Sequence, residues 1–313
     1  MGGVMKPVFV INGFLESGKT EFIKFTLQQD YFRTKGVTLL LLCEEGENEY
    51  DEDLLKRTNT VVERIEKKED FIGSKLIELE KKHKPERILI EYNGMWPMAN
   101  LKFPWHWKLN QQITIINAAT WPMFYNNMRS MIGDMVRKSE LIIFNRCDGI
   151  KELASYKRNM RALNRDAEII FEDKNGEVTA TMEEELPFDV SADTIELTDK
   201  TYGIWFFDML DTPDRYENKT VKFLAHVAKP KEFHPGCFVP GRHAMTCCAE
   251  DIAFLGFVAK YGNAQKIDDG KWYNVTATVK HEFWADYKGV GPVLYIADIT
   301  SADAPAEEII NLV

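Results

Sequence analysis

The 313-residue sequence predicts an α/β domain with a mostly parallel sheet, followed by a small antiparallel β-domain. Over the first 175 residues, short apolar runs alternate with charge-rich helical stretches, which is the pattern of a parallel sheet covered by helices. From about Glu172 the sequence becomes acidic and loses any sustained period, and short apolar runs then recur between Gly, Pro and Asp turns. We therefore expect a first domain at 1–175, an acidic connecting segment at 176–215 and a β-domain at 216–313.

Continuous apolar runs predict the strands of the first domain, because strands covered on both faces have no polar side. These runs lie at 8–12, 37–42, 87–92, 113–117, 141–145 and 167–171. Apolar residues at helical spacing predict helices between them, at 19–29, 75–83 and 153–163. In the β-domain the candidate strands are 220–228, 237–245, 272–283 and 292–299, and they suggest a small barrel.

Composition and charge exclude several classes of protein. Hydrophobic residues make up 45% of the chain and charged residues 28%, which excludes a disordered protein. The net charge of −10 disfavours binding to nucleic acid or anionic lipid. No apolar run approaches the roughly 20 residues that a membrane-spanning helix needs, and the N-terminus lacks the apolar core of a secretory signal. We expect a cytoplasmic protein with no nucleic-acid partner and no membrane insertion.

A phosphate-binding motif follows the first predicted strand. The segment GFLESGKT matches the pattern G-x-x-x-x-G-K-[ST] at every fixed position, between a strand and a helix. Its glycines allow backbone amides to surround phosphates, Lys19 would reach the outer phosphates, and Thr20 would offer its hydroxyl to Mg²⁺. We expect nucleotide contacts from Gly13, Glu16, Ser17, Gly18, Lys19, Thr20 and Glu21.

The predicted strand at 141–145 ends in a candidate base-reading motif. Asn145-Arg146-Cys147-Asp148 is similar to the guanine-reading N-K-x-D pattern, with Arg in place of Lys. Asp148 could accept hydrogen bonds from the N1–H and exocyclic amine of guanine, which adenine does not offer. Asn145 would brace the loop, and Arg146 would stack on the base. The motif therefore favours GTP over ATP.

Two acidic positions follow predicted strands, where ligands of open α/β sheets collect. Glu91 ends the strand at 87–92, and Glu44 follows the strand at 37–42. Either carboxylate could hold Mg²⁺ together with Thr20, directly or through water. We expect Lys19, Thr20 and Glu91 to act in catalysis on the nucleotide, mostly by positioning and by neutralising charge.

Histidines and cysteines cluster in the β-domain. His234, Cys237, His243, Cys247 and Cys248 fall within one short stretch, and such nitrogen and sulfur donors suit Zn²⁺. The spacing is not that of a standard zinc finger, and adjacent cysteines on a regular strand point to opposite faces. Three interpretations stay open: a zinc site made of Cys237, His243, Cys247 and Cys248, a redox role, or inert buried thiols.

The ordered set of motifs resembles the CobW/HypB/UreG family of metal-handling GTPases, and its CobW-like branch in particular. The resemblance covers roughly residues 6–172 and rests on GFLESGKT, CEEG, EYNG, NRCD and LNRDA, in that order. It implies a P-loop fold, slow GTP hydrolysis with Mg²⁺, and loading or delivery of a transition metal such as zinc or cobalt to a client protein. The chain departs from the family in one feature. CobW-like proteins carry a C-x-C-C metal motif between the segments that correspond to CEEG and EYNG, whereas residues 51–91 of this chain contain no cysteine.

The stretch PGRHAMTCCAEDIAFLGF is similar to a C-terminal domain attached to some bacterial CobW-like proteins, and that resemblance implies an OB-like barrel. The sequence also allows a second function, a nucleotide-gated module with little turnover that regulates a partner such as a transporter. In that case the Cys/His cluster would be structural. A P-loop kinase is a further alternative, and homodimer formation is left open.

Overall fold

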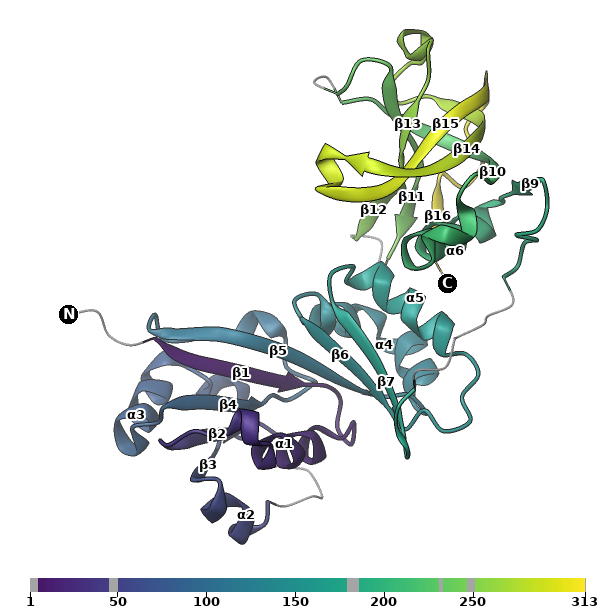
Figure 1. The fold of residues 1–313 in the computed structure, drawn as a ribbon. Coiled ribbons are helices and arrows are strands. Elements are labelled where there is room, and N and C mark those ends of the chain that lie inside the picture. Colours follow the sequence, from purple (N-terminus) through teal and green to yellow (C-terminus); the bar gives the residue numbers. More distant parts are fainter. Residues whose placement is uncertain (1–4, 45–49, 179–185, 231–232, 247–250, 313) are drawn as a thin grey trace. The chain divides into compact units, whose positions relative to one another are not determined.

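The computed structural model describes residues 5–44, 50–178, 186–230, 233–246 and 251–312. The chain forms two compact units (Figure 1). The first consists of Met1–Leu153 with Leu163–Met182, and the second of Ala154–Ala162 with Glu183–Val313. The second unit thus includes a short stretch, Ala154–Ala162, within the range expected for the first domain, and it begins before residue 216.

The first unit is built on a twisted sheet in the strand order β3-β2-β4-β1-β5-β6-β7-β8 (Figure 1). All neighbouring strands are parallel except β7 and β8. The strands are β1 (Lys6–Asn12), β2 (Thr38–Leu42), β3 (Thr60–Arg64), β4 (Arg87–Glu91), β5 (Trp107–Asn117), β6 (Leu141–Asn145), β7 (Glu168–Asp173) and β8 (Gly176–Glu177). The predicted α/β class and parallel sheet are confirmed, and each predicted strand overlaps an observed one.

Helices cover both faces of this sheet. One core layer packs Leu76 and Leu79 of the third helix against Val8 and Val10 of β1. The opposite layer packs Ile23 of the first helix against the other face. The helices of this unit are α1 (Lys19–Gln28), α2 (Glu52–Arg57), α3 (Gly73–His83) and α4 (Trp121–Val136), with 3-10 turns at Asp30–Phe32, Lys68–Asp70 and Met98–Asn100. Helix α5 (Leu153–Leu163) falls mostly in the second unit.

The second unit contains a closed barrel of five strands. Its ring runs β11-β13-β15-β14-β10 and closes through the pairing of β10 with β11. Most pairs are antiparallel, whereas β13 and β15 are parallel, so the predicted small and mostly antiparallel β-domain is confirmed as an OB-like barrel. The strands are β9 (Thr194–Glu196), β10 (Thr220–Ala228), β11 (Cys237–Met245), β12 (Ile252–Gly256), β13 (Val258–Lys260), β14 (Trp272–Trp284), β15 (Gly289–Ser301) and β16 (Ile309–Asn311).

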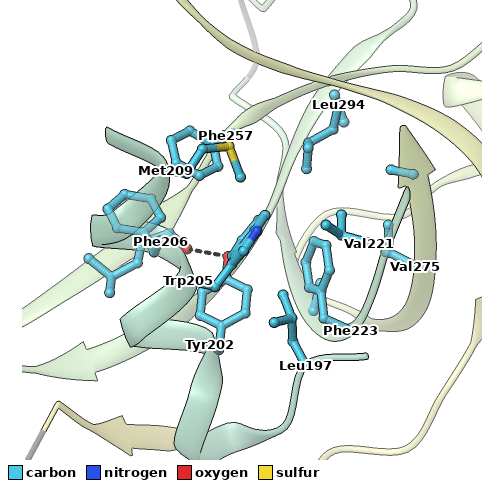
Figure 2. Close-up of a cluster of buried hydrophobic side chains, with 14 of the residues drawn as sticks. Leu197, Tyr202, Trp205, Phe206, Met209, Val221, Phe223, Phe257, Val275 and Leu294 are labelled. Carbon is cyan, nitrogen blue, oxygen red and sulfur yellow. Dashed lines mark hydrogen bonds between the residues drawn. The ribbon is translucent and has the colours of Figure 1, made fainter. Parts of the chain in front are cut away.

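An aromatic helix, α6 (Asp199–Asp211), packs into the barrel core (Figure 2). Trp205 is completely buried and contacts the rings of Phe223 and Phe257. Tyr202 donates a hydrogen bond from its hydroxyl to the carbonyl of Leu255 at 3.0 Å. The acidic segment that the sequence analysis took for a connector therefore supplies part of the core. Short 3-10 turns at Pro213–Tyr216, Ala264–Lys266 and Ala285–Tyr287 complete the unit.

Among the described helices, none combines the length and the apolar character needed to span a membrane.

Candidate nucleotide-binding site

The predicted nucleotide-binding residues gather at one edge of the first sheet. The phosphate-binding loop follows β1, Glu44 follows β2, Glu91 ends β4 and Asn145 ends β6. Because these strands are parallel, their carboxyl ends face the same edge, which is where open α/β sheets bind ligands. The sheet topology thus brings together residues that lie as far apart as 13 and 145 in the sequence.

Glycines shape the phosphate-binding loop because side chains would not fit. Gly13 has φ 140° and Gly18 has φ 100°, a region that L-residues rarely adopt. A Cβ at Gly13 would lie 2.2 Å from the carbonyl oxygen of Ile115, and one at Gly18 would lie 2.5 Å from Nδ2 of Asn145. Gly94, beyond β4, approaches the same loop, since its Cβ would come within 2.3 Å of the Gly13 carbonyl oxygen. The loop therefore contacts its neighbours directly through the backbone of its glycines, which have no side chain.

Lys19 is buried at the first position of α1 and is held by three oxygens. Its Nζ donates to the carbonyls of Gly13 and Phe14, both at 2.8 Å, and lies 2.5 Å from Oε2 of Glu44. Burial raises the pKa of the Glu44 carboxyl, an effect that the positive charge of Lys19 opposes. The Glu44 carboxylate therefore occupies the position next to Lys19 that a phosphate would need.

Thr20 and Glu91 form the second polar group of the site. Thr20 donates from Oγ1 to Oε1 of Glu91 at 2.7 Å, and Tyr50 donates from its hydroxyl to Oε2 at 2.6 Å. Burial and the negative charge of Glu91 raise the pKa of Tyr50. Sequence reasoning missed Tyr50, because it lies in no motif and meets Glu91 only through the fold. An isolated tyrosine after an acidic stretch of sequence gives no signal of this role.

The residues present fit a nucleotide with its Mg²⁺. The oxygens of Thr20, Glu44 and Glu91 are the hard donors that Mg²⁺ prefers. Ser17 has a buried hydroxyl without a hydrogen-bond partner among the described residues, beside the glycines of the loop. Such an unpaired group is explained if a ligand completes the loop.

The candidate base-reading motif is tied to the phosphate-binding loop. Asn145 donates from Nδ2 to the carbonyl of Ser17 at 2.7 Å, which links the end of β6 to the phosphate-binding loop. Arg146, in the left-handed region with φ 56°, donates from Nη1 to the carbonyl of Glu16 at 2.9 Å. Asp148 lies exposed beyond them, and Glu21 is exposed on the first turn of α1. The side chain of Glu16 is exposed as well, and its contact with Arg146 is made through the backbone carbonyl.

In the second unit, the structure does not bring Cys237 and His243 together. They stand at positions one and seven of the continuous strand β11, so their Cα atoms are about 20 Å apart. Cys237 packs against Val258, Trp284 and Val293, and its burial raises the pKa of the thiol. Cys247 and Cys248 lie outside the described residues. Within the part of the chain that is described, no group of three or more His, Cys, Asp or Glu residues could hold a metal ion.

The family model that matches the first unit settles the chain's relationship. The CobW/HypB/UreG nucleotide-binding domain matches residues 7–171, which is more than half of the chain. The chain belongs to the CobW/HypB/UreG family. Members of this family are P-loop GTPases linked to metal handling, and this CobW-like chain carries their nucleotide-binding domain. A second family model, the DUF1980 C-terminal domain, matches residues 173–310.

Solved structures similar to this CobW-like chain include two HypB proteins, the first described as a hydrogenase maturation factor, and the YjiA GTPase. HypB from Archaeoglobus fulgidus is 18% identical with a TM-score of 0.41, covering 55% of this chain and 84% of its own. Zn(II)-bound YjiA GTPase from E. coli is 14% identical with a TM-score of 0.41, covering 82% and 89%. HypB from Helicobacter pylori in complex with nickel is 15% identical with a TM-score of 0.37, covering 54% and 80%. No curated protein matches the chain significantly.

Proposed function

We propose that this protein is a cytoplasmic, Mg²⁺-dependent GTPase whose nucleotide state controls the handling of a transition metal, zinc or cobalt, for a client protein. The observation that carries the proposal is the arrangement at the sheet edge. Buried Lys19, the Thr20–Glu91 pair and Asn145 all meet one glycine-shaped loop. This is the set of groups that phosphoryl transfer needs for positioning and charge neutralisation.

Each residue has a defined task in this proposal. Lys19 exchanges the Glu44 carboxylate for the outer phosphates, and the amides of the loop surround them. Thr20 and Glu91, which are bonded to each other here, would hold Mg²⁺ directly or through water. Mg²⁺, when bound, neutralises charge on the phosphates. Glu44 would be a further oxygen ligand for this ion once Lys19 contacts the phosphates.

Base recognition falls to the loop after β6. Asn145 and Arg146 hold this loop against the carbonyls of Ser17 and Glu16. Asp148 is exposed next to that anchored segment, where its carboxylate can accept two hydrogen bonds from guanine. We propose GTP rather than ATP as the substrate for this reason.

For the metal cargo we propose ligands in the second unit. The sequence candidates there are His243, Cys247 and Cys248. Cys237 is left out because β11 places it far from His243, and the proposal rests on His243, which the structure describes. The absence of cysteine from 51–91 favours this location over one between the nucleotide switches. The same absence supports the alternative of a regulatory module that turns over little GTP and carries no metal.

Zinc affinity measured with and without nucleotide tests the proposal. Purified protein is titrated against a chromophoric chelator, in Mg²⁺ alone and with a nonhydrolysable GTP analogue. We expect the analogue to shift zinc affinity by more than about tenfold, which is about 1.4 kcal/mol of coupling.

Lys19→Ala is the control for this titration, because it removes the phosphate contact while leaving the second unit unchanged. It should bind zinc as the wild type does and show no shift with the analogue. Zinc binding that ignores nucleotide in the wild type would contradict the coupling. No zinc binding at all would favour the regulatory alternative.

A further inference from the structure

Two histidines that are distant in the sequence lie side by side on the outer face of the barrel. His226 on β10 alternates with Ala225 and Val227, which belong to the core, so its ring faces outward. His243 on β11 precedes the core residue Ala244 and faces outward in the same way. The antiparallel register of β10 and β11 pairs His226 with Gly241, which places the two imidazoles diagonally opposite each other.

The two imidazoles are in close contact and are enclosed by aromatic rings. Their ring centroids are 5.2 Å apart, with the ring planes inclined at 54°. Trp272 lies on the far side of His226 at 5.2 Å, and Phe254 lies beside His243 at 5.0 Å. These neighbours come from β14 and β12, so four strands together fix the orientation of the pair.

The nitrogens of this pair lack partners. Neither side chain forms a hydrogen bond or ion pair with any residue that the structure describes, and Nδ1 of His226 is buried without a partner. His281 of the same unit differs in that it contacts Glu217 through Nδ1 at 2.8 Å, although its Nε2 is buried without a partner among the described residues. A buried polar nitrogen without a partner needs an explanation, and a bound ion is one.

We propose that His226 and His243 together bind one divalent transition-metal ion, with Zn²⁺ as the probe that best fits two imidazole donors. Zinc binds histidine nitrogen at about 2.0–2.1 Å with tetrahedral geometry, so two imidazoles on one ion have ring centres about 5 Å apart. The observed separation of 5.2 Å matches this value.

The surroundings of the pair suit such a site. The carboxylate of Glu308 acts electrostatically on His243, and it precedes β16, whose Ile309 pairs with His243 in the sheet. A negative charge there partly balances that of a cation. Two protein ligands leave the remaining coordination positions to water or to a client, which suits exchangeable cargo better than a closed structural site. The inference deepens the metal-handling part of the proposed function and rests on it for its purpose, although binding itself requires no nucleotide.

Zinc titration of the full-length, nucleotide-free protein tests the pair. The variants are His226→Gln, His243→Gln and the double variant, measured by competition with a chromophoric chelator. We expect each single change to weaken zinc affinity at least tenfold. The double variant should be weakened by no more than about a further twofold, because a two-ligand site is already lost when one ligand is removed. Wild-type affinity in both single variants, or additive losses in the double variant, would overturn the proposal.

Controls separate this site from others and from misfolding. His281→Gln removes an imidazole that already has a carboxylate partner, and it should leave zinc affinity unchanged. His226→Phe keeps a ring between Trp272 and His243 but removes both nitrogens, so it must lose zinc while keeping the wild-type unfolding midpoint. If a Cys247→Ser/Cys248→Ser variant abolished zinc binding and the histidine changes had no effect, the metal would belong to the thiols and the proposed histidine site would be wrong.

GTP affinity is measured on every variant. Zinc loss with normal GTP binding is expected of the pair variants, whereas absence of GTP binding in a zinc-competent wild type would refute the proposed function instead.

Discussion

The first unit has a candidate nucleotide site at the edge of its sheet, and the barrel has a candidate metal site at His226 and His243. The two sites differ in whether their polar side chains already have partners. At the nucleotide edge, the polar side chains are bonded to one another: Lys19 to Glu44, and Thr20 to Glu91. On the barrel, His226 and His243 have no partner among the described residues. A ligand at the first site must replace existing contacts, whereas one at the second adds contacts to groups that have none. Affinity at the first site therefore depends on what is displaced.

The two units also differ in how their cores are built. The first unit buries aliphatic strands under amphipathic helices on both faces. The second closes its barrel over an aromatic helix whose Tyr202, Trp205, Phe206 and Phe207 are all buried. Large side chains concentrate the stabilisation of the second unit in few residues, so a single truncation there should have a large effect.

Trp205→Ala should give the largest effect on stability. Trp205 is fully buried among Tyr202, Phe223 and Phe257, and truncating such a side chain costs about 3–5 kcal/mol through lost burial and the cavity left behind. Urea denaturation followed by far-ultraviolet circular dichroism measures the free energy of unfolding, and GTP titration reports on the first unit. We expect earlier unfolding with GTP binding retained under native conditions.

Trp105→Ala is the matched control, since Trp105 is 80% exposed. Its loss should change the free energy of unfolding by no more than about 0.5 kcal/mol. Equal effects of the two substitutions would mean that α6 does not hold the barrel core as described.

Asp148→Asn should give the next largest effect, on ligand choice rather than on stability. The substitution removes the carboxylate that would accept two hydrogen bonds from guanine, each bond to a charged group being worth about 1.5–3 kcal/mol. We expect GTP affinity to fall about 10- to 100-fold and xanthosine triphosphate affinity to rise, as measured by fluorescence titration. Asp148 is exposed, so the fold should not change.

Glu16→Gln is the control for this exchange, because Glu16 contacts Arg146 through its backbone carbonyl and not its side chain. GTP affinity should stay within about threefold of the wild type. If Asp148→Asn weakened both nucleotides equally, the loop after β6 would not read the base.

Local patterns predicted the first unit well, because its decisive features are local. Continuous apolar runs mark strands that are buried on both faces, and Gly13 and Gly18 are required by positive φ and close backbone contacts in the loop. Glu91 was predicted from its place at the end of a strand, and the structure places its carboxylate within a hydrogen bond of Thr20. Its role at a bound metal stays a prediction. Tyr50 was missed because its contact with Glu91 spans 41 residues and no motif encodes it.

The second unit was harder to predict because its decisive features arise from strand pairing and enclosure. Helix α6 is apolar on most of its surface, so it shows little amphipathic period, and the acidic residues around it suggested a connector. Proximity in the sequence grouped Cys237 with His243, but an extended strand separates them. His226 was not considered, since only the register of β10 on β11 brings it to His243.

Glu44→Gln should give the smallest effect and sharpens the contrast between the two sites. In the absence of Mg²⁺, the Glu44 carboxylate competes with phosphate for Lys19, so removing its charge should tighten GTP binding by a few fold. This corresponds to a gain of about 1 kcal/mol in binding free energy, because the attraction within a buried ion pair is largely offset by the cost of desolvating its charges. With Mg²⁺ present the gain should shrink, because the variant also lacks a proposed metal ligand.

Burial raises the pKa of Glu44, so its carboxylate becomes protonated at a higher pH than an ordinary glutamate would. As the pH falls through that pKa, wild-type GTP affinity should approach that of the variant. Their ratio is the quantity to measure, since protonation of the γ-phosphate affects both proteins equally. A ratio that does not change with pH would mean that Glu44 does not compete with the nucleotide.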